Sequence, residues 1–232
     1  MRIYRSKRRV RVGDCDSKGR LRVDAIARYL QDIGYDDTND LGLGDGGRWV
    51  ARSIEIENLA KDSKLWPIRN EIVSLETFCG GIGKVIAQRN VDIFLSDKKS
   101  IQTKTLWVSL DENYKPTVVP SWLKQTYPEA INVSSKRILA TQVTEKELQS
   151  IISFQFNLRQ SDIDINLHAN NSFAFDVLFE ASQLCGYENF SRTYIEYHAA
   201  IGLDDEVTVL VSKDETGFAA WIKASNDVAC SM

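Results

Sequence analysis

The sequence predicts an α+β protein of two related domains in tandem, each a long helix wrapped by a curved antiparallel sheet. Both halves show the same order of a strand, a polar turn, a long apolar helix and several further strands. The motif R-x-x-D-x-D occurs in each half, beginning at Arg11 and at Arg159, 148 positions apart (159 − 11). The segments after each helix alternate between apolar and polar residues, with the period of two that is typical of antiparallel strands.

Composition and charge indicate an ordinary globular protein. The chain has 232 residues, 43% of them hydrophobic and 26% charged, which is enough for two domains of about 100 residues. A net charge of −3 gives the molecule as a whole no attraction for nucleic acid or acidic membranes. No apolar run approaches the ~20 residues of a membrane span, and the first residues lack the apolar core of a signal peptide. We therefore expect a soluble cytoplasmic protein.

The cysteines and histidines argue against a disulfide framework and against a metal site. The four cysteines lie far apart without a CxxC pair, as in reduced cytosolic proteins. With only two histidines, a histidine-based metal site is not expected, and we predict no cofactor. The cysteines are Cys15, Cys79, Cys185 and Cys230.

The first half predicts one helix among five strands. Residues 1–13 alternate basic and apolar, which favours a solvated edge strand over a cationic patch for an acidic partner. Apolar residues recur at helical spacing over about 22–36, and a loop rich in Gly and Asp follows. The glycines at 80–83 predict a turn or bulge, because neither GK[ST] nor a helix follows them as in a phosphate loop. Further strands are expected at 49–57, 71–78, 85–95 and 104–110, with a hairpin turn at 97–99.

Three of the four prolines lie in 111–149, which indicates a connection between domains. We therefore predict a first domain at 1–125, a linker at 126–149 and a second domain at 150–232. In the second half, a helix is expected at about 170–186 and strands at 151–158, 192–198, 206–212 and 217–224.

Residues 162–171, Asp-Ile-Asp-Ile-Asn-Leu-His-Ala-Asn-Asn, gather polar side chains directly before the second helix. A strand or extended turn there would point Asp164, Asn166 and His168 the same way. At the offset of 148, the two aspartates have counterparts in the first half, whereas the Asn and His positions hold Lys18 and Arg20. We interpret the second copy as the active one and the first as freed for binding or structure.

The pattern Asp162-x-Asp164-x-Asn166-x-His168-x-Asn170-Asn171 resembles the signature of the acyl-acyl carrier protein thioesterases, whose fold is a tandem pair of hotdog domains. The resemblance covers nearly the whole chain. Further pieces that resemble the family are Arg11-Val12, Gly19-Arg20-Leu21, Gly47-x-Trp49-Val50, Trp66-Pro67, Leu106-Trp107-Val108, and Ile195-Glu196-Tyr197 with Gly202 and Asp204.

The resemblance implies hydrolysis of acyl-acyl carrier protein (acyl-ACP) thioesters, which releases free fatty acid and ends its synthesis. Its partner is then the carrier protein, and a homodimer is left open. The acyl chain would lie in the first domain and catalysis in the second. The candidate acyl-binding residues, for which core packing is an equal explanation, are Ile26, Tyr29, Leu30, Ile33, Trp49 and Phe78. The basic residues considered for the carrier protein are Arg8, Arg9, Arg20, Lys136 and Arg137.

Thioester hydrolysis needs an activated water, a polarised carbonyl and a stabilised thiolate. A histidine side chain, which ordinarily titrates near neutral pH, suits a general base, and His168 is the candidate. Asp164 would orient the base and the water, and Asn166 would position water or substrate. The backbone N–H groups of Ala169, Asn170 and Asn171 at the helix start would stabilise the oxyanion.

Structural roles are the alternative for each of these residues. Asp164 or Asn170 would simply cap the helix, Asn166 would close an Asx-turn, and His168 would be a satisfied buried histidine. The combination of the three types, and its loss from the first copy, favours chemistry.

One departure from the family pattern bears on the mechanism. The plant members carry Glu and Cys, both proposed as catalytic, where this sequence has Ala200 and Ile201. A covalent Cys–His mechanism is therefore not available at that position. His198 lies nearby, and a surface strand histidine is its simpler explanation. Two other functions stay open: hydrolysis of acyl-CoA or another thioester, and acyl binding without catalysis; a hotdog dehydratase fits least.

Overall fold

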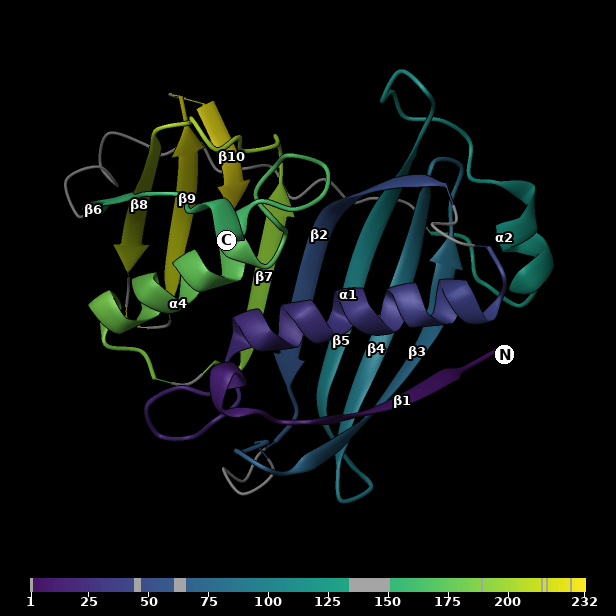
Figure 1. Ribbon diagram of the computed structural model, residues 1–232, viewed down its shortest axis with the longest axis horizontal. Coiled ribbons are helices and arrows are strands. Elements are labelled where there is room, and N and C mark those ends of the chain that lie inside the picture. Colours follow the sequence, from purple (N-terminus) through teal and green to yellow (C-terminus); the bar gives the residue numbers. More distant parts are fainter. Residues whose placement is uncertain are drawn as a thin grey trace. The chain divides into compact units, whose positions relative to one another are not determined.

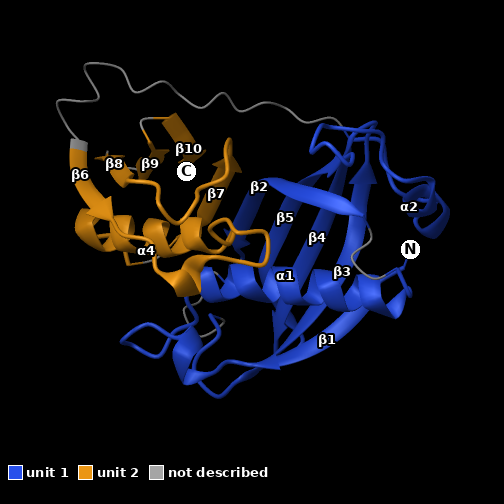
Figure 2. Ribbon diagram, turned by 45° about the horizontal axis from the view of Figure 1, so that its top comes forward, with its two compact units in different colours: residues 1–136 blue, residues 137–232 orange. Residues whose placement is uncertain are grey.

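A computed structural model describes residues 2–43, 47–60, 66–133, 151–188, 190–213, 215, 217–225 and 227–232. The chain forms two compact units, residues 1–136 and 137–232 (Figure 2). The first unit extends past the predicted boundary at 125, because Tyr127 is buried in its core.

In its described residues the first unit has a five-stranded antiparallel sheet with one long helix against it (Figure 1). Its strand order is β1-β3-β4-β5-β2, so β1 is an edge strand, as predicted. Its elements are β1 (Tyr4–Arg9), the 3-10 turn η1 (Val12–Asp14), α1 (Val23–Asp40), β2 (Arg48–Asn58), β3 (Ile72–Ile82), β4 (Ile86–Leu95), β5 (Lys98–Leu110) and α2 (Ser121–Thr126).

Helix α1 continues one turn beyond the predicted end near residue 36, because a buried carboxylate fixes its last turn. Asp37 accepts hydrogen bonds from Arg2 Nη2 at 3.0 Å, Arg89 Nη1 at 2.7 Å and Tyr127 Oη at 2.9 Å. Two guanidinium groups and a hydroxyl offset the cost of burying that charge. The apolar face of α1 forms the core beneath it.

The glycine run at the end of β3 is a bulge, as predicted, and serves close packing of the backbone. The register with β4 shifts between Cys79 and Gly81. Ile82 N–H donates to Ile131 O at 2.8 Å, and a Cβ atom on Gly81 would overlap the Val133 side chain. The hairpin turn falls at Ser96 and Asp97, both with positive φ, so β5 begins six residues before the predicted 104.

The second unit repeats this plan with its own helix and sheet. The strand order is β7-β10-β9-β8-β6, and its pairs are antiparallel. Helix α4 buries Phe173, Phe175 and Val177 and ends at Gly186, whose φ of 78° suits glycine. The elements are β6 (Ile151–Phe156), the 3-10 turn η3 (Gln160–Asp162), α4 (Phe173–Cys185), β7 (Arg192–Tyr197), β8 (Val207–Lys213), β9 (Phe218–Ala224) and β10 (Asp227–Ser231).

The predicted α+β class, with one long helix against an antiparallel sheet in each half, is confirmed. Two elements were missing from the prediction, α2 and β10. Both are short, at six and five residues, and neither carries enough residues to show a clear period.

Candidate active site

The polar stretch before α4 forms a tight hairpin, which we call the catalytic turn (residues 162–171) after the role predicted for it. Ile163 and Ala169 pair as an antiparallel bridge. Asp164 N–H donates to His168 O at 2.9 Å, and Leu167 N–H donates to Asp164 O at 3.0 Å. Leu167 completes the reversal with a φ of 64°. The predicted strand or extended turn is therefore a closed turn.

This turn places Asp164 and His168 opposite each other through their backbone bond and holds Asn166 against Asp164. Asp164 Oδ1 accepts from the Asn166 N–H at 2.8 Å, which is an Asx-turn. Its other oxygen, Oδ2, has a contact of only 3.5 Å with the Asn166 side-chain amide. The His168 side chain is exposed, so it is not the satisfied buried histidine of the alternative interpretation. Because that contact is long, Oδ2 can still accept a hydrogen bond from an imidazole or a water.

An arginine that we did not single out as a site residue anchors the turn. Arg159 donates to Asp162 through its backbone N–H at 2.8 Å and through Nη2 at 2.7 Å. Burial alone would raise the pKa of the Asp162 carboxyl, but these hydrogen bonds lower that pKa below its ordinary value. Arg159 opens the repeated R-x-x-D motif, so the repeat was a signal for it.

The start of α4 offers fewer free N–H groups than predicted. Ala169 N–H donates to Ile201 O at 2.8 Å, and Asn170 N–H donates to Asp162 O at 2.8 Å. Of the three predicted N–H groups these two are engaged, so the predicted oxyanion role narrows to the Asn171 N–H. The Asn170 carboxamide closes an Asx-turn just before the helix, since its Oδ1 accepts from Ser172 N–H at 2.9 Å.

A second residue missed from the sequence supports the helix start. Tyr197 Oη donates to Asn171 O at 2.7 Å, and burial raises the pKa of this phenol well above its ordinary value. Nothing local in the sequence connects Tyr197 with Asn171, which lie 26 positions apart.

The first unit repeats the backbone of the catalytic turn bond for bond. Asp16 N–H donates to Arg20 O at 2.8 Å, Gly19 N–H to Asp16 O at 2.9 Å, and Lys18 N–H to Asp16 Oδ1 at 2.9 Å. Gly19 has a φ of 77° where the second unit has Leu167. Each partner sits at the offset of 148 found in the sequence, so the duplication is confirmed at the level of hydrogen bonds.

The two turns differ in the group that contacts the second carboxylate oxygen of their shared aspartate, which is Asp16 in the first unit and Asp164 in the second. In the first unit, Arg20 Nε donates to Asp16 Oδ2 at 2.8 Å, which closes a salt bridge inside the turn. In the second unit the residue at the Arg20 position is His168. The replacement leaves Asp164 without that cation and leaves an ionisable base in its place.

The stretch that departs from the family pattern borders the catalytic turn. Ile201 is buried, and its carbonyl accepts from Ala169 N–H. Ala200 is exposed. His198 directly follows β7 and is half-buried, with Nε2 at 2.9 Å from Ser231 Oγ of β10. No thiol lies at the position of the family cysteine, and the histidine near it is engaged in the sheet.

The predicted acyl-binding residues lie in the first unit. Ile26, Tyr29, Leu30 and Ile33 are buried along α1. Tyr29 Oη donates to Asp14 Oδ2 at 2.7 Å. Trp49 is half-buried against the cluster formed by Ile82, Ala87, Val119, Leu123 and Tyr127, and Phe78 is half-buried on β3.

Among the basic residues considered for the carrier protein, two are paired with carboxylates. Arg8 contacts Asp36 at 2.6 Å and Arg20 contacts Asp16. Arg9 is exposed, and its Nη1 donates to the Asn70 carbonyl at 2.9 Å. Lys136 and Arg137 lie outside the described residues.

No helix in the described ranges is long and apolar enough to cross a bilayer. Within the same ranges, no cluster of three His, Cys, Asp or Glu side chains is arranged to hold a metal ion. All four cysteines are free thiols.

The two helix-and-sheet units, each with a polar turn before its helix, define a protein of the tandem hotdog class. The sequence matches the family model of the acyl-ACP thioesterase N-terminal domain over residues 1–121 and that of the C-terminal domain over residues 145–229. The chain therefore belongs to the acyl-ACP thioesterase family, and its activity is hydrolysis of acyl-ACP thioesters.

Solved structures show the same fold over nearly the whole chain. One described as an oleoyl thioesterase from Lactobacillus plantarum is 18% identical, with a TM-score of 0.84 over 99% of this chain and 94% of that one. An acyl-ACP thioesterase from Bacteroides thetaiotaomicron is 20% identical, with a TM-score of 0.76 over 99% and 95%. A 12:0-ACP thioesterase from Umbellularia californica is 16% identical, with a TM-score of 0.80 over 99% and 95%. A search of curated proteins found no match.

Proposed function

We propose that the catalytic turn of the second unit hydrolyses the acyl-ACP thioester with His168 as general base and Asp164 as its orienting carboxylate. One observation carries the assignment. The two turns share their backbone hydrogen bonds. In the first turn Arg20 forms a salt bridge with Asp16, whereas in the second turn the position of Arg20 holds His168 and the second oxygen of Asp164 has only the 3.5 Å contact with Asn166. A repeat that was purely structural would have no reason to lose the Arg20 salt bridge.

The chemical steps follow from these groups. His168 takes a proton from water, and the resulting hydroxide forms a bond to the thioester carbonyl carbon. The carbonyl oxygen becomes an oxyanion, which the Asn171 N–H and the positive end of the α4 dipole stabilise. Collapse of this intermediate breaks the C–S bond, and the imidazolium returns its proton to the departing thiolate. The products are a fatty acid and the carrier protein with a free thiol.

Asp164 and Asn166 have supporting parts in this scheme. The Asp164 carboxylate stabilises the imidazolium while it holds the turn through Asn166 N–H. The Asn166 side chain is exposed beside that carboxylate and positions the water or the substrate. Because Ile201 stands at the position of the family cysteine, the scheme uses water directly and forms no acyl-enzyme.

The first unit, residues 1–125 in our prediction, is proposed to hold the acyl chain beneath α1, where Ile26, Leu30 and Ile33 supply an apolar face. The second unit, from residue 150, supplies the catalytic turn, and 126–149 connects the two. Free cysteines support a reducing, cytoplasmic location. Assembly as a homodimer belongs to the proposal as well, and sedimentation of the purified protein tests it.

The experiment is a side-by-side measurement of free thiol release from acyl-ACP and acyl-CoA with chains from C8 to C18. We expect kcat/KM to be higher for at least one acyl-ACP than for the acyl-CoA of the same length. A higher kcat/KM for acyl-CoA at every chain length would mean that the substrate is carried by CoA and not by the carrier protein. Tight binding of acyl chains without turnover of any thioester would replace the hydrolase with an acyl-binding protein.

A further inference from the structure

Two aliphatic side chains at the tip of the catalytic turn have no part in the hydrolytic scheme. Ile165 is 96% exposed and Leu167 is 78% exposed, which makes them the two most exposed large apolar side chains among the described residues. We call this pair the apolar tip. The two residues alternate in sequence with Asn166 and His168, whose side chains are exposed as well. The exposed surface around His168 therefore carries two apolar side chains.

The first unit shows that the turn closes without these side chains. At the offset of 148, Ile165 corresponds to Ser17 (165 − 148) and Leu167 corresponds to Gly19 (167 − 148). With a serine and a glycine at these positions, the turn of the first unit makes the same backbone hydrogen bonds. An apolar side chain at either position is therefore unnecessary for the fold of the turn.

Leu167 also occupies a backbone conformation that disfavours it. Its φ of 64° lies in the left-handed region, where Gly19 of the first unit has a φ of 77°. Glycine adopts this region freely, whereas a Cβ atom there comes too close to the following carbonyl oxygen. Among the described residues Leu167 is the one aliphatic residue with positive φ. The second turn thus keeps a leucine where glycine would fit better, beside an isoleucine that gains nothing from burial.

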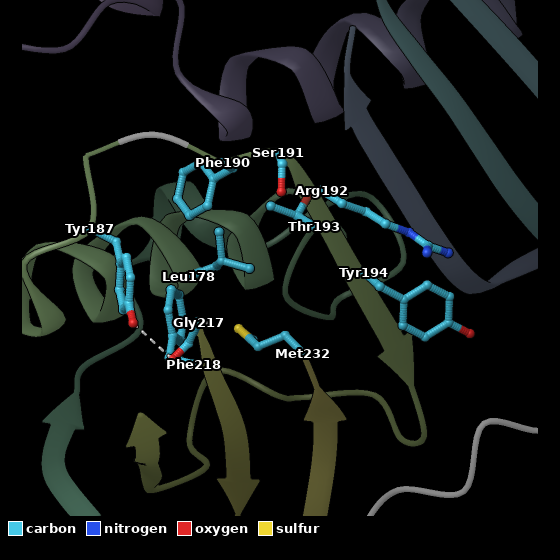
Figure 3. A pocket seen from close by; sticks show the side chains of 10 residues that line it. All are labelled: Leu178, Tyr187, Phe190, Ser191, Arg192, Thr193, Tyr194, Gly217, Phe218 and Met232. Carbon is cyan, nitrogen blue, oxygen red and sulfur yellow. Dashed lines mark hydrogen bonds between the residues drawn. The ribbon is translucent and has the colours of Figure 1, made fainter. Parts of the chain in front are cut away.

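The apolar tip does not belong to the cavity of the second unit. That cavity, of about 150 Å³, is lined by α4, the segment after it, β7, β9 and the end of the chain (Figure 3). Its lining contains Ser191 and Arg192 and no residue of the catalytic turn. A contact that covers the apolar tip must therefore come from a binding partner. Exposed apolar side chains next to polar groups are typical of surfaces that bind another protein.

We propose that the apolar tip, Ile165 and Leu167, is a docking contact for the acyl carrier protein that delivers the thioester. The inference rests on the hydrolytic function proposed above, because it takes His168 as the group to which the thioester is delivered. The acyl chain is assigned to the interior of the first unit, so it does not account for an exposed surface. A protein that brings its thioester to an exposed imidazole covers the residues beside that imidazole. Burial of aliphatic side chains then favours the complex.

The size of the contact suits a substrate protein that leaves after each turnover. Small, transient interfaces bury less surface than stable ones, and a contact centred on two side chains belongs to that class. Burial of one exposed aliphatic side chain contributes about tenfold or more to affinity. Loss of both side chains should therefore be measurable as a weaker complex without loss of the fold.

The test gives the second turn the residues of the first. In the double variant Ile165→Ser/Leu167→Gly, both positions carry the side chains with which the first turn closes. The full-length protein is titrated by NMR with the acyl carrier protein of the same organism, bearing a free thiol and no acyl chain. We expect the Kd of the carrier protein to rise about tenfold or more. An unchanged Kd would overturn the proposal. This measurement needs no turnover, so failure of docking and failure of hydrolysis are separate results.

A second titration distinguishes the carrier protein from its thiol-bearing arm. The carrier protein without that arm should also bind the wild type, and the double variant should weaken this binding by a similar factor. A loss of affinity that appears only with the arm present would assign the contact to the arm. Absence of binding between the wild type and the carrier protein without its arm would do the same. Either result would overturn the proposal.

The matched control is an exposed leucine elsewhere in the second unit. Leu184 lies on α4 and is 52% exposed, and Leu184→Ser should bind the carrier protein as the wild type does. An equal loss of affinity in this variant would contradict a specific contact at the tip. The double variant should melt at or above the wild-type temperature, because glycine suits the positive φ at position 167. A lower melting temperature would show that the two side chains stabilise the turn itself and would refute the argument.

Discussion

Replacement of Asp164 by asparagine isolates the charge of the orienting carboxylate from its structural role. The variant keeps an oxygen that can accept from the Asn166 N–H, now 2.8 Å from Asp164 Oδ1. The turn should therefore close as before. What disappears is the negative charge beside the imidazolium that forms when His168 takes a proton from water.

The magnitude follows from the electrostatics of that pair. The proposed role requires the imidazolium and the carboxylate to approach to about 4 Å, and at an effective dielectric constant of about 20 two unit charges at that separation interact by about 4 kcal/mol. This corresponds to about 10³-fold in rate. Because His168 is exposed and Asp164 is half-buried, water weakens the interaction, and we expect kcat to fall by about 10²- to 10³-fold.

The matched control is Asp16→Asn in the first unit, which makes the same change in the same turn geometry. Asp16 pairs with Arg20 at 2.8 Å, and the Asp16 side chain is only 9% exposed, so loss of this pair should cost more than loss of an exposed pair, which is about 0–1 kcal/mol. We expect wild-type kcat and a lower melting temperature. The assay is steady-state release of free thiol from acyl-ACP. An Asp164→Asn variant with more than half of wild-type kcat, or an equal loss in Asp16→Asn, would refute the reasoning.

Three further predictions follow from the described contacts. Alkylation of the native protein at neutral pH should leave hydrolysis unchanged, because the proposed mechanism uses no thiol. Cys230 should stay unmodified, because it is buried and burial raises its pKa to about 12. Loss of activity in proportion to the labelling of any cysteine would contradict the water mechanism. Stability should fall as pH drops below about 4, because the folded state lowers the pKa of Asp162, and the stability that its ionised form contributes is lost as pH falls through that folded pKa. The Asp162→Asn variant lacks this group, so its melting temperature should fall less between pH 6 and pH 3. A fall as large as that of the wild type would be inconsistent with the Arg159 anchor. Arg9→Glu should raise KM for acyl-ACP several-fold at low salt, because an exposed cation attracts an acidic carrier protein. The same variant should leave KM for acyl-CoA unchanged. Equal effects on both substrates would exclude docking of the carrier protein at Arg9.

The sequence predicted the parts of the fold and site that depend on local pattern. Helical spacing located α1 and α4, and alternation located the strands. The R-x-x-D-x-D repeat predicted two equivalent turns, and the structure repeats their hydrogen bonds at the same offset. The repeat also singled out Asn166 and His168 as the difference between them.

What the sequence could not show depends on contacts between distant residues. The N–H groups of Ala169 and Asn170 are engaged by Ile201 and Asp162, so the oxyanion prediction narrows to Asn171. The alternating pattern at 163–168 indicated an extended chain, yet Ile165 is 96% exposed at the tip of a closed turn. The Asx-turn of Asp164 outweighs the apolar alternation there, because no core lies opposite those side chains.

The core of the first unit gives a similar example. Leu123 of α2 and Tyr127 bury themselves against Ile82 and Ala87, about 40 positions away in sequence. Prolines in that region indicated a connection, and the short helix between them carries too few apolar residues to reveal its partner. Tyr127 adds a hydrogen bond to Asp37, 90 positions distant.

The most direct test of the central claim uses the two histidines of the chain. His168→Ala should lower kcat for acyl-ACP hydrolysis by about 10²- to 10⁴-fold, the range for loss of a general base. His198→Ala removes the ring bonded to Ser231 and should keep kcat within a few-fold of wild type. Wild-type turnover in His168→Ala, or a larger loss in His198→Ala, would contradict the assignment of the catalytic turn.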